Sequence, residues 1–98
     1  MFHIEELCPI CHVGPIGFLM CSDGKTLVLV CDECNAVWLD AHAVLAESAV
    51  FPSSPEYSVE QLHCSVASSA GARWATMEVI ESANLSILVS GEGESIND

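Results

Sequence analysis

Apolar residues in the first part of the chain gather in short stretches of the kind that form β-strands. A strand is predicted over residues 16–21 (IGFLMC), and a second over residues 26–30 (TLVLV), which are largely β-branched and apolar. Asp23-Gly24 stands between them and is a dipeptide typical of tight hairpin turns. Residues 36–39 (AVWL) predict a third short strand. The pattern therefore predicts a small three-stranded antiparallel sheet.

Beyond this sheet the spacing of apolar residues changes to that of amphipathic helices. A helical stripe covers residues 41–49 and ends before Pro52. Residues 58–61 (SVEQ) have the form of a capping box and predict a second helix that extends to about Ser68. These short helices are expected to pack on the sheet or to be appended to it.

The last third of the chain predicts one more helix and a frayed end. Thr76 is expected to be its N-cap and Asn84 its C′ residue. Residues 85–89 (LSILV) predict a final strand or extended segment, and residues 91–98 a flexible tail. The predicted fold class is α+β, in three parts: a sheet with metal-binding turns (1–40), short helices with a possible final strand (41–90), and the tail (91–98).

Four of the six cysteines have a spacing that points to chemistry. They form the pattern C-x2-C-x19-C-x2-C with Cys8, Cys11, Cys31 and Cys34. A gap of two residues lets a tight turn aim both sulfurs at one point, and the 19 residues between the pairs match the predicted hairpin. Four thiolates at the head of a hairpin suit Zn²⁺, which accepts tetrahedral sulfur ligands. The pattern therefore predicts a zinc ribbon with one metal ion.

Other readings of these cysteines stay open. Two redox dithiols would each require a thioredoxin-like setting, which Pro9 and the Gly-Pro stretch after Cys11 disfavour, and disulfides would require an oxidising compartment. The same four thiolates could also hold one iron ion for electron transfer, as in rubredoxin-like proteins. His12 and Asn35 stand where such turns usually carry glycine, and asparagine tolerates the left-handed conformation better than histidine.

With both cysteine pairs and the VWLD segment at residues 37–40, the chain resembles the bacterial zinc ribbons grouped as TFIIB-type zinc fingers. The resemblance covers roughly residues 7–45 and departs from the family pattern at Ala36 and near Ala43. It implies a metal-bound fold with a binding role. It also suggests that Trp38 lies over the metal-binding turns and that Asp40 caps the helix that follows.

Composition and charge narrow the function further. The chain of 98 residues has 14 acidic residues against Lys25 and Arg73, giving a formal net charge of −12. Unaided binding of DNA or RNA is not expected, because phosphate neutralisation requires several basic side chains. A protein partner with a basic surface is electrostatically favoured. Neither a secretory signal nor a membrane-spanning stretch is recognisable, so a cytoplasmic location is expected.

The remaining cysteines, Cys21 and Cys64, are expected to be buried free thiols. The histidines and acids form no recognisable catalytic constellation, and four thiolates would close the metal's coordination sphere. We therefore expect a non-enzymatic protein-binding or adaptor module with a structural metal. Neutralising a basic partner is one form that this role could take. The alternative is a rubredoxin-like or redox-responsive metal protein.

Overall fold

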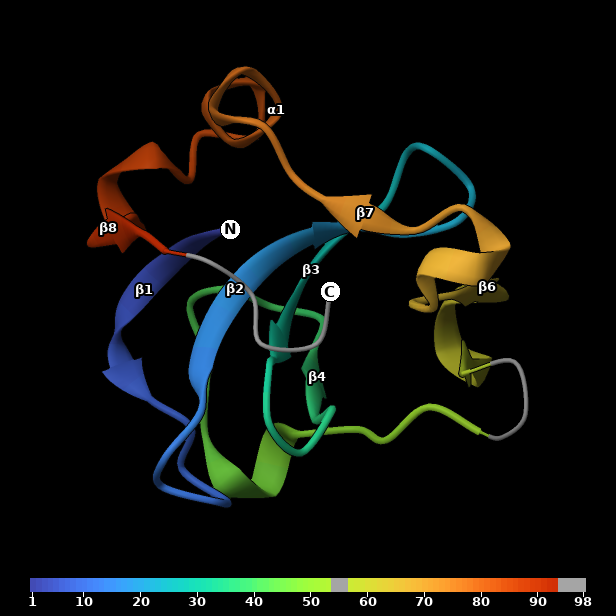
Figure 1. Cartoon of the computed structure of the whole chain (residues 1–98), viewed down its shortest axis with the longest axis horizontal. Helices are drawn as coiled ribbons and strands as arrows, with labels where there is room; N and C mark the ends of the chain where they lie inside the picture. Colours follow the sequence, from blue (N-terminus) through green and yellow to red (C-terminus); the bar gives the residue numbers. More distant parts are fainter. Residues whose placement is uncertain (54–56, 94–98) are drawn as a thin grey trace.

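The centre of the molecule is an antiparallel β-sheet, in a computed structural model that describes residues 1–53 and 57–93 (Figure 1). Five strands lie side by side in the order β4-β3-β2-β1-β8, and β7 joins the same sheet by pairing with β2. The strands are β1 (Phe2–Leu7), β2 (Pro15–Met20), β3 (Leu27–Cys31), β4 (Val37–Trp38), β7 (Arg73–Trp74) and β8 (Gly91–Glu92). Among the described residues α1 (Met77–Ser82) is the only α-helix. The predicted α+β class with an antiparallel sheet is confirmed.

The β2–β3 hairpin is the longest regular pairing in the sheet. Its register runs from Ile16 opposite Cys31 to Met20 opposite Leu27. β4 continues the sheet on the outer edge of β3, so all three strands predicted from the apolar pattern are present. On the other edge of β2, β1 pairs near the start of the strand and β7 pairs near its end.

The turn of this hairpin is held by one acidic side chain. Oδ1 of Asp23 accepts hydrogen bonds of 2.9 Å from the backbone N–H groups of Lys25 and Thr26. Its other oxygen accepts the Thr26 hydroxyl at 2.6 Å. These bonds to the ionised form lower the pKa of Asp23 to about 2. Gly24 takes a φ of 70°, the left-handed conformation that the Asp-Gly dipeptide predicts.

Apolar side chains cover both faces of the sheet and form two core clusters. One face carries Ile16, Phe18 and Leu29 into a cluster with Trp38 and Ile80, the buried residue of α1. The alternate residues of the same strands point the other way. They build a second cluster with the segment that follows residue 57, and its members are Leu19, Cys21, Val28, Val30, Val37, Val59, Cys64 and Ala72.

The predicted helix over residues 41–49 is wrong. Asp40 does not cap a helix: its Oδ1 accepts the backbone N–H of His42 at 2.9 Å and closes a turn. A 3-10 turn, η1 (Ala46–Ser48), is the only helical geometry in this stretch. Of the four apolar residues in the predicted stripe, Ala41, Val44 and Ala49 pack on the first cluster, whereas Leu45 is 52% exposed.

Two contacts of β4 explain why this segment stays extended. The indole N–H of Trp38, which is 1% exposed, donates to the carbonyl of Leu45 at 2.8 Å. Val37 and Val50 exchange two backbone hydrogen bonds of 2.8 Å. These tertiary contacts give the buried indole N–H an acceptor and pair the backbone of the edge strand β4. They therefore outweigh the weak helical preference of residues 41–49.

The predicted helix from residue 58 to about residue 68 is also wrong. The chain instead forms a small hairpin of β5 (Ser58–Val59), the 3-10 turn η2 (Glu60–Leu62) and β6 (Cys64–Ser65). His63 adopts a left-handed φ of 54°, which ends η2 and reverses the chain. The pairing buries Val59 and Cys64 against the sheet. A third 3-10 turn, η3 (Ser68–Ala70), leads from this hairpin to β7.

The prediction of a helix after Thr76 is confirmed. The side chain of Thr76 accepts the N–H of Val79 at 3.3 Å at the start of α1. Asn84 follows the helix with a φ of 62°, the left-handed conformation expected of a C′ residue. None of the described helices is long and apolar enough to cross a bilayer.

The end of the chain differs from the prediction in two respects. Residues 85–89 contain the 3-10 turn η4 (Ser86–Leu88) and no strand. Gly91 and Glu92, expected in the tail, form β8 and pair with β1. The sequence pattern did not predict β1 either. The rest of the predicted tail, residues 94–98, lies outside the described residues. Strands from the second half of the chain thus complete the sheet begun by the first half.

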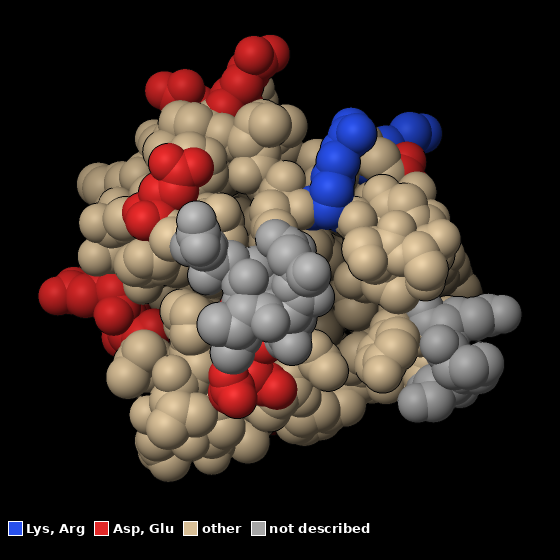
Figure 2. All heavy atoms as spheres, viewed as in Figure 1, with Lys and Arg blue, Asp and Glu red and all other residues tan. Residues whose placement is uncertain are grey.

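Charged side chains are unevenly distributed over the face shown in Figure 2. Acidic side chains lie along the margin over β1 and over α1, whereas the blue Lys and Arg side chains gather at one corner over β7. With 14 acidic and two basic residues in the chain, the acidic margin has no basic side chains interspersed on this face.

Candidate metal centre

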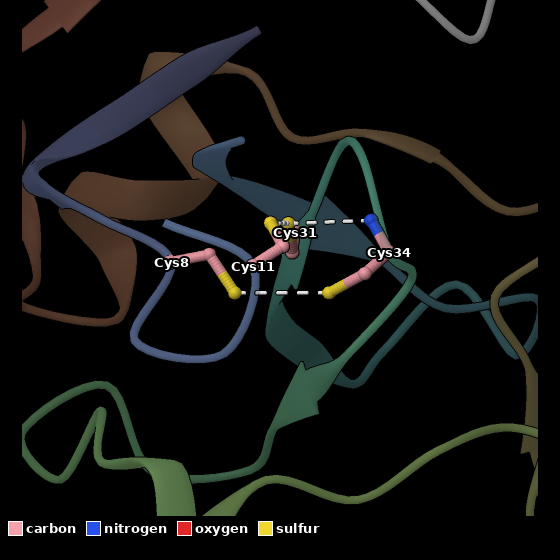
Figure 3. Close-up of side chains that lie close together, drawn as sticks. All are labelled: Cys8, Cys11, Cys31 and Cys34. Carbon is pink, nitrogen blue, oxygen red and sulfur yellow. Dashed lines mark hydrogen bonds between the residues drawn. The ribbon is translucent and has the colours of Figure 1, made fainter. Parts of the chain in front are cut away.

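Two loops bring the four predicted ligands together at one end of the sheet. The first loop joins β1 to β2 and carries Cys8 and Cys11; the second joins β3 to β4, begins after Cys31 at the end of β3 and carries Cys34 (Figure 3). The hairpin register explains their meeting, because Ile16 at the start of β2 lies opposite Cys31 at the end of β3. The predicted arrangement of two cysteine turns across a hairpin is present.

The spacing of the sulfur atoms fits one tetrahedral ion. All four Sγ atoms lie within 4.8 Å of one another. The Cys8–Cys34 sulfur pair is 3.7 Å apart and the Cys11–Cys31 pair 3.6 Å apart. Zinc–sulfur bonds of about 2.3 Å in a tetrahedron require sulfur separations of about 3.8 Å. The four cysteines therefore form a site that could hold a metal ion.

Backbone N–H groups of both loops point at the sulfurs. Ile10 N–H donates to Sγ of Cys8 at 3.3 Å, and Glu33 and Cys34 donate to Sγ of Cys31 at 3.4 and 3.5 Å. Such bonds favour the thiolate form over the thiol. They also hold the turns in the shape that aims each sulfur at the shared point.

The residue after each cysteine pair has the same unusual conformation. His12 has a φ of 61° and Asn35 a φ of 65°. Each donates its N–H to the carbonyl of the first cysteine of its pair, to Cys8 at 2.9 Å and to Cys31 at 3.1 Å. Asparagine was expected to replace glycine here, but histidine does so equally. The metal-binding turns are thus closed by backbone hydrogen bonds at the positions where the sequence lacks glycine.

Two of the four cysteines are shielded from water by the protein core. Cys8 and Cys31 are 1% and 0% exposed, and they belong to the same core cluster as Trp38. Cys11 and Cys34 are partly exposed and border this cluster. The bulky indole adds apolar surface behind the metal-binding loops, where a small domain has little other core.

The pKa of Cys11 in the first loop is shifted in the opposite direction from the pKa of Cys31 and Cys34. Backbone N–H groups, that of Val13 foremost, lower the pKa of Cys11 to about 7. Burial raises the pKa of Cys31 and Cys34 above that of an ordinary thiol. Four thiolates packed this closely repel one another, so a bound divalent cation would favour the ionised set.

Gly14 is a site residue that the cysteine spacing alone did not reveal. A Cβ atom at this position would lie 2.5 Å from Sγ of Cys31 and 2.7 Å from Cβ of Glu33. The two loops therefore touch at a point where only glycine fits. The sequence signal for this contact is the Gly14-Pro15 pair at the start of β2.

Cys21 and Cys64 are not part of the metal centre. They are buried in the second core cluster, on the other face of the sheet. Burial and the neighbouring Cys64 thiol raise the pKa of Cys21 to about 12. The expected buried thiols are therefore present, and they lie next to each other. Within residues 1–53 and 57–93 no other group of His, Cys, Asp and Glu side chains could hold a metal ion.

Comparison of the chain with known protein families, with curated proteins and with solved structures gave no match. The resemblance to TFIIB-type zinc ribbons therefore rests on the motif in residues 7–45 alone.

Proposed function

We propose that this chain is a zinc-ribbon protein with a structural metal, and that it acts as an acidic module that binds a basic protein without catalysing a reaction. The observation that supports the proposal most is the convergence of four sulfurs within 4.8 Å, two of them buried in the core. A metal bound there links β1–β2 to β3–β4. In a chain of 98 residues this link would replace apolar core that the domain lacks.

Four sulfur ligands leave no position at the metal for water or substrate. Catalytic zinc sites usually use three protein ligands and keep the fourth position open. The three N–H···S bonds and the surrounding core would further exclude solvent from the sulfurs. These features support a structural role for the ion, and a reducing compartment such as the cytoplasm would keep the thiols available for it.

The electrostatics support a partner with a basic surface. Four thiolates and one Zn²⁺ would add about two negative charges to the formal −12, which counts cysteine as neutral. At physiological ionic strength such a charge attracts basic proteins over about 8 Å and repels nucleic-acid phosphates. An adaptor that neutralises a toxin, a nuclease or another basic protein is one form of this role.

An electron-transfer role for bound iron is the second candidate. It is supported by the paired N–H···S bonds and the left-handed His12 and Asn35, since rubredoxin-like centres use the same kind of turn. The metal distinguishes the two functions. Purified protein that is colourless and contains zinc supports the first, whereas a red protein with a reversible one-electron couple supports the second.

Affinity capture with the metal-loaded chain tests the binding role. Proteins captured at about 0.15 M salt are compared with those captured by the Cys34→Ser variant, and their isoelectric points are determined. We expect partners with isoelectric points above neutrality that the variant does not retain. Equal capture by the variant, or capture of acidic proteins only, would contradict the proposal, as would tight binding to duplex DNA at the same salt.

A further inference from the structure

The loop that carries Cys8 and Cys11 exposes three apolar side chains at its surface. Leu7 is 55% exposed, Ile10 36% and Val13 65%; we call these three residues the loop patch. Leu7 pairs with Pro15 at the base of the loop, and Cys8 N–H donates to the carbonyl of Gly14, the residue after Val13, at 3.0 Å, so the two ends of the loop lie side by side. Ile10 lies between the two metal-binding cysteines, so all three belong to one short segment of chain.

Acidic side chains border the loop patch. Glu5 and Glu6 precede Leu7 on β1 and are exposed, and the acidic margin over β1 is visible in Figure 2. Glu33, also exposed, lies on the second loop beside Gly14, the residue after Val13, because a Cβ on Gly14 would be 2.7 Å from Cβ of Glu33. The blue Lys and Arg side chains gather elsewhere, over β7. An apolar centre with an acidic rim results.

The loop that presents the patch is held in one conformation. The His12 N–H donates to the Cys8 carbonyl at 2.9 Å, Ile10 N–H donates to Sγ of Cys8 at 3.3 Å, and a bound metal would fix both cysteines. Exposed apolar side chains on a rigid segment lose little conformational entropy when a partner covers them. Apolar residues gathered in this way are typical of the centre of an interaction surface.

We propose that the loop patch with Glu5, Glu6 and Glu33 is the docking surface for an amphipathic basic segment of a partner protein, with apolar residues at the centre and Lys or Arg around them. The inference rests on the proposed function and specifies which surface performs it. Leu7, Ile10 and Val13 supply the apolar contact, and the three glutamates select a basic rim on the partner.

The other occupants of such a surface fit the charges less well. A second copy of this chain would bring another −12 to an acidic rim, so self-association through the patch is opposed by repulsion. An added β-strand is disfavoured because β1 is irregular between His3 and Leu7, where its register against β2 shifts. The partner therefore makes side-chain contacts with the loop patch and does not extend the sheet.

Peptide binding by the metal-loaded full chain tests this surface. The probe is a fluorescent 14-residue peptide of leucine and lysine whose order places all leucines on one helical face; a second peptide has the same composition in scrambled order. At about 0.15 M salt we expect the amphipathic peptide to bind roughly tenfold more tightly than the scrambled one. Equal affinities would overturn the apolar half of the proposal.

Matched variants locate the contact. Leu7→Asn with Val13→Asn removes the two most exposed apolar side chains of the loop patch, and Ile87→Asn makes the same kind of change at an 87% exposed residue of η4. The patch variant should lose the roughly tenfold preference for the amphipathic peptide, and the Ile87 variant should keep it. Equal effects of the two variants would overturn the assignment of the surface.

A second pair of variants tests the acidic rim, and both variants change the net charge of the chain by the same amount. Glu5→Gln with Glu6→Gln alters the rim, whereas Glu78→Gln with Glu81→Gln alters exposed residues of α1. We expect only the rim variant to weaken binding of both peptides by several-fold. If the wild-type chain binds the peptides and the two double variants change the affinity equally, the proposed surface is wrong but the proposed binding of basic partners stands. If neither peptide binds the wild-type chain, the proposed function itself fails.

Discussion

Replacing Gly14 by alanine should distort the metal centre from within. The added Cβ would lie 2.5 Å from Sγ of Cys31, 2.7 Å from Cβ of Glu33 and 3.2 Å from its backbone nitrogen. Ordinary contacts between such atoms are about 3.5–4.0 Å, so the sulfur and the second loop must retreat by about 1 Å. That displacement is large against a zinc–sulfur bond of about 2.3 Å.

The cost follows from overpacking a rigid contact. Inserting a methyl group into a packed interior costs about 1–3 kcal/mol, which corresponds to a loss of about 5-fold to 150-fold in metal affinity if the metal site yields. Competition of the protein with a chromophoric chelator measures this loss. Cobalt substitution reports its cause, because the visible and near-ultraviolet bands of Co²⁺ depend on tetrahedral thiolate geometry.

Gly24→Ala is the matched control. Gly24 has a φ of 70° and no heavy atom within 4 Å of an added Cβ, so alanine there introduces backbone strain of about 1 kcal/mol without touching the cysteines. The control should lower stability slightly and leave the cobalt spectrum unchanged. A Gly14→Ala protein with wild-type metal affinity and an unaltered spectrum would refute the proposed contact between the two loops.

Three further predictions concern the metal, the buried thiols and the helix. Cys34→Ser should abolish cooperative unfolding of the sheet as followed by circular dichroism, since it removes a ligand from a structural site; a native-like melting curve would contradict that role. Cys21 should react with iodoacetamide in the folded protein much more slowly at pH 8 than a thiol with the ordinary pKa of 9.0, because a pKa of about 12 leaves roughly 900-fold less thiolate and the sulfur is buried. Its raised pKa should also make the fold less stable as pH rises from 9 towards 12, because the unfolded chain loses this proton first; alkylation of Cys21 at the rate of an unfolded control, as shown by mass spectrometry, would be inconsistent with burial. Thr76→Ala should lower the free energy of unfolding by about 1 kcal/mol in denaturant titrations and leave metal affinity unchanged, because the side chain caps α1 at 3.3 Å from Val79 N; no loss of stability would show that the cap is unimportant.

The metal-binding half of the fold was predictable because its determinants are local. Alternating apolar residues, the Asp23-Gly24 turn and the spacing of the cysteine pairs each act within a few residues or across one hairpin. Together they predict β2, β3 and β4, their order and the four cysteines that converge, but not β1. The capped helix after Thr76 was predictable for the same reason, since its start and end signals, Thr76 and Asn84, lie immediately beside its two ends.

The remainder depends on contacts between segments distant in sequence. Residues 41–49 have an apolar residue every three to four positions. The buried indole of Trp38 nevertheless donates a hydrogen bond to the Leu45 carbonyl, and the chain stays extended. The capping-box pattern at residues 58–61 gives way to a hairpin because Val59 and Cys64 both pack against the sheet. Neither local pattern carries information about these partners.

The edges of the sheet illustrate the same limit. β1 has three consecutive exposed residues, Glu5, Glu6 and Leu7, so its pattern does not alternate as a strand's usually does. Its partner β8 contains Gly91, a residue that is typical of loops. The pairing of these two segments continues at Met1 and Gly93, which exchange two hydrogen bonds of 2.9 Å.

X-ray absorption spectroscopy of the freshly purified protein, combined with elemental analysis, examines the metal centre directly. We expect about one equivalent of zinc per chain, with four sulfur neighbours at about 2.3 Å and no nitrogen or oxygen ligand. A metal content below about half an equivalent, or a first shell containing nitrogen or oxygen, would contradict a four-cysteine structural site.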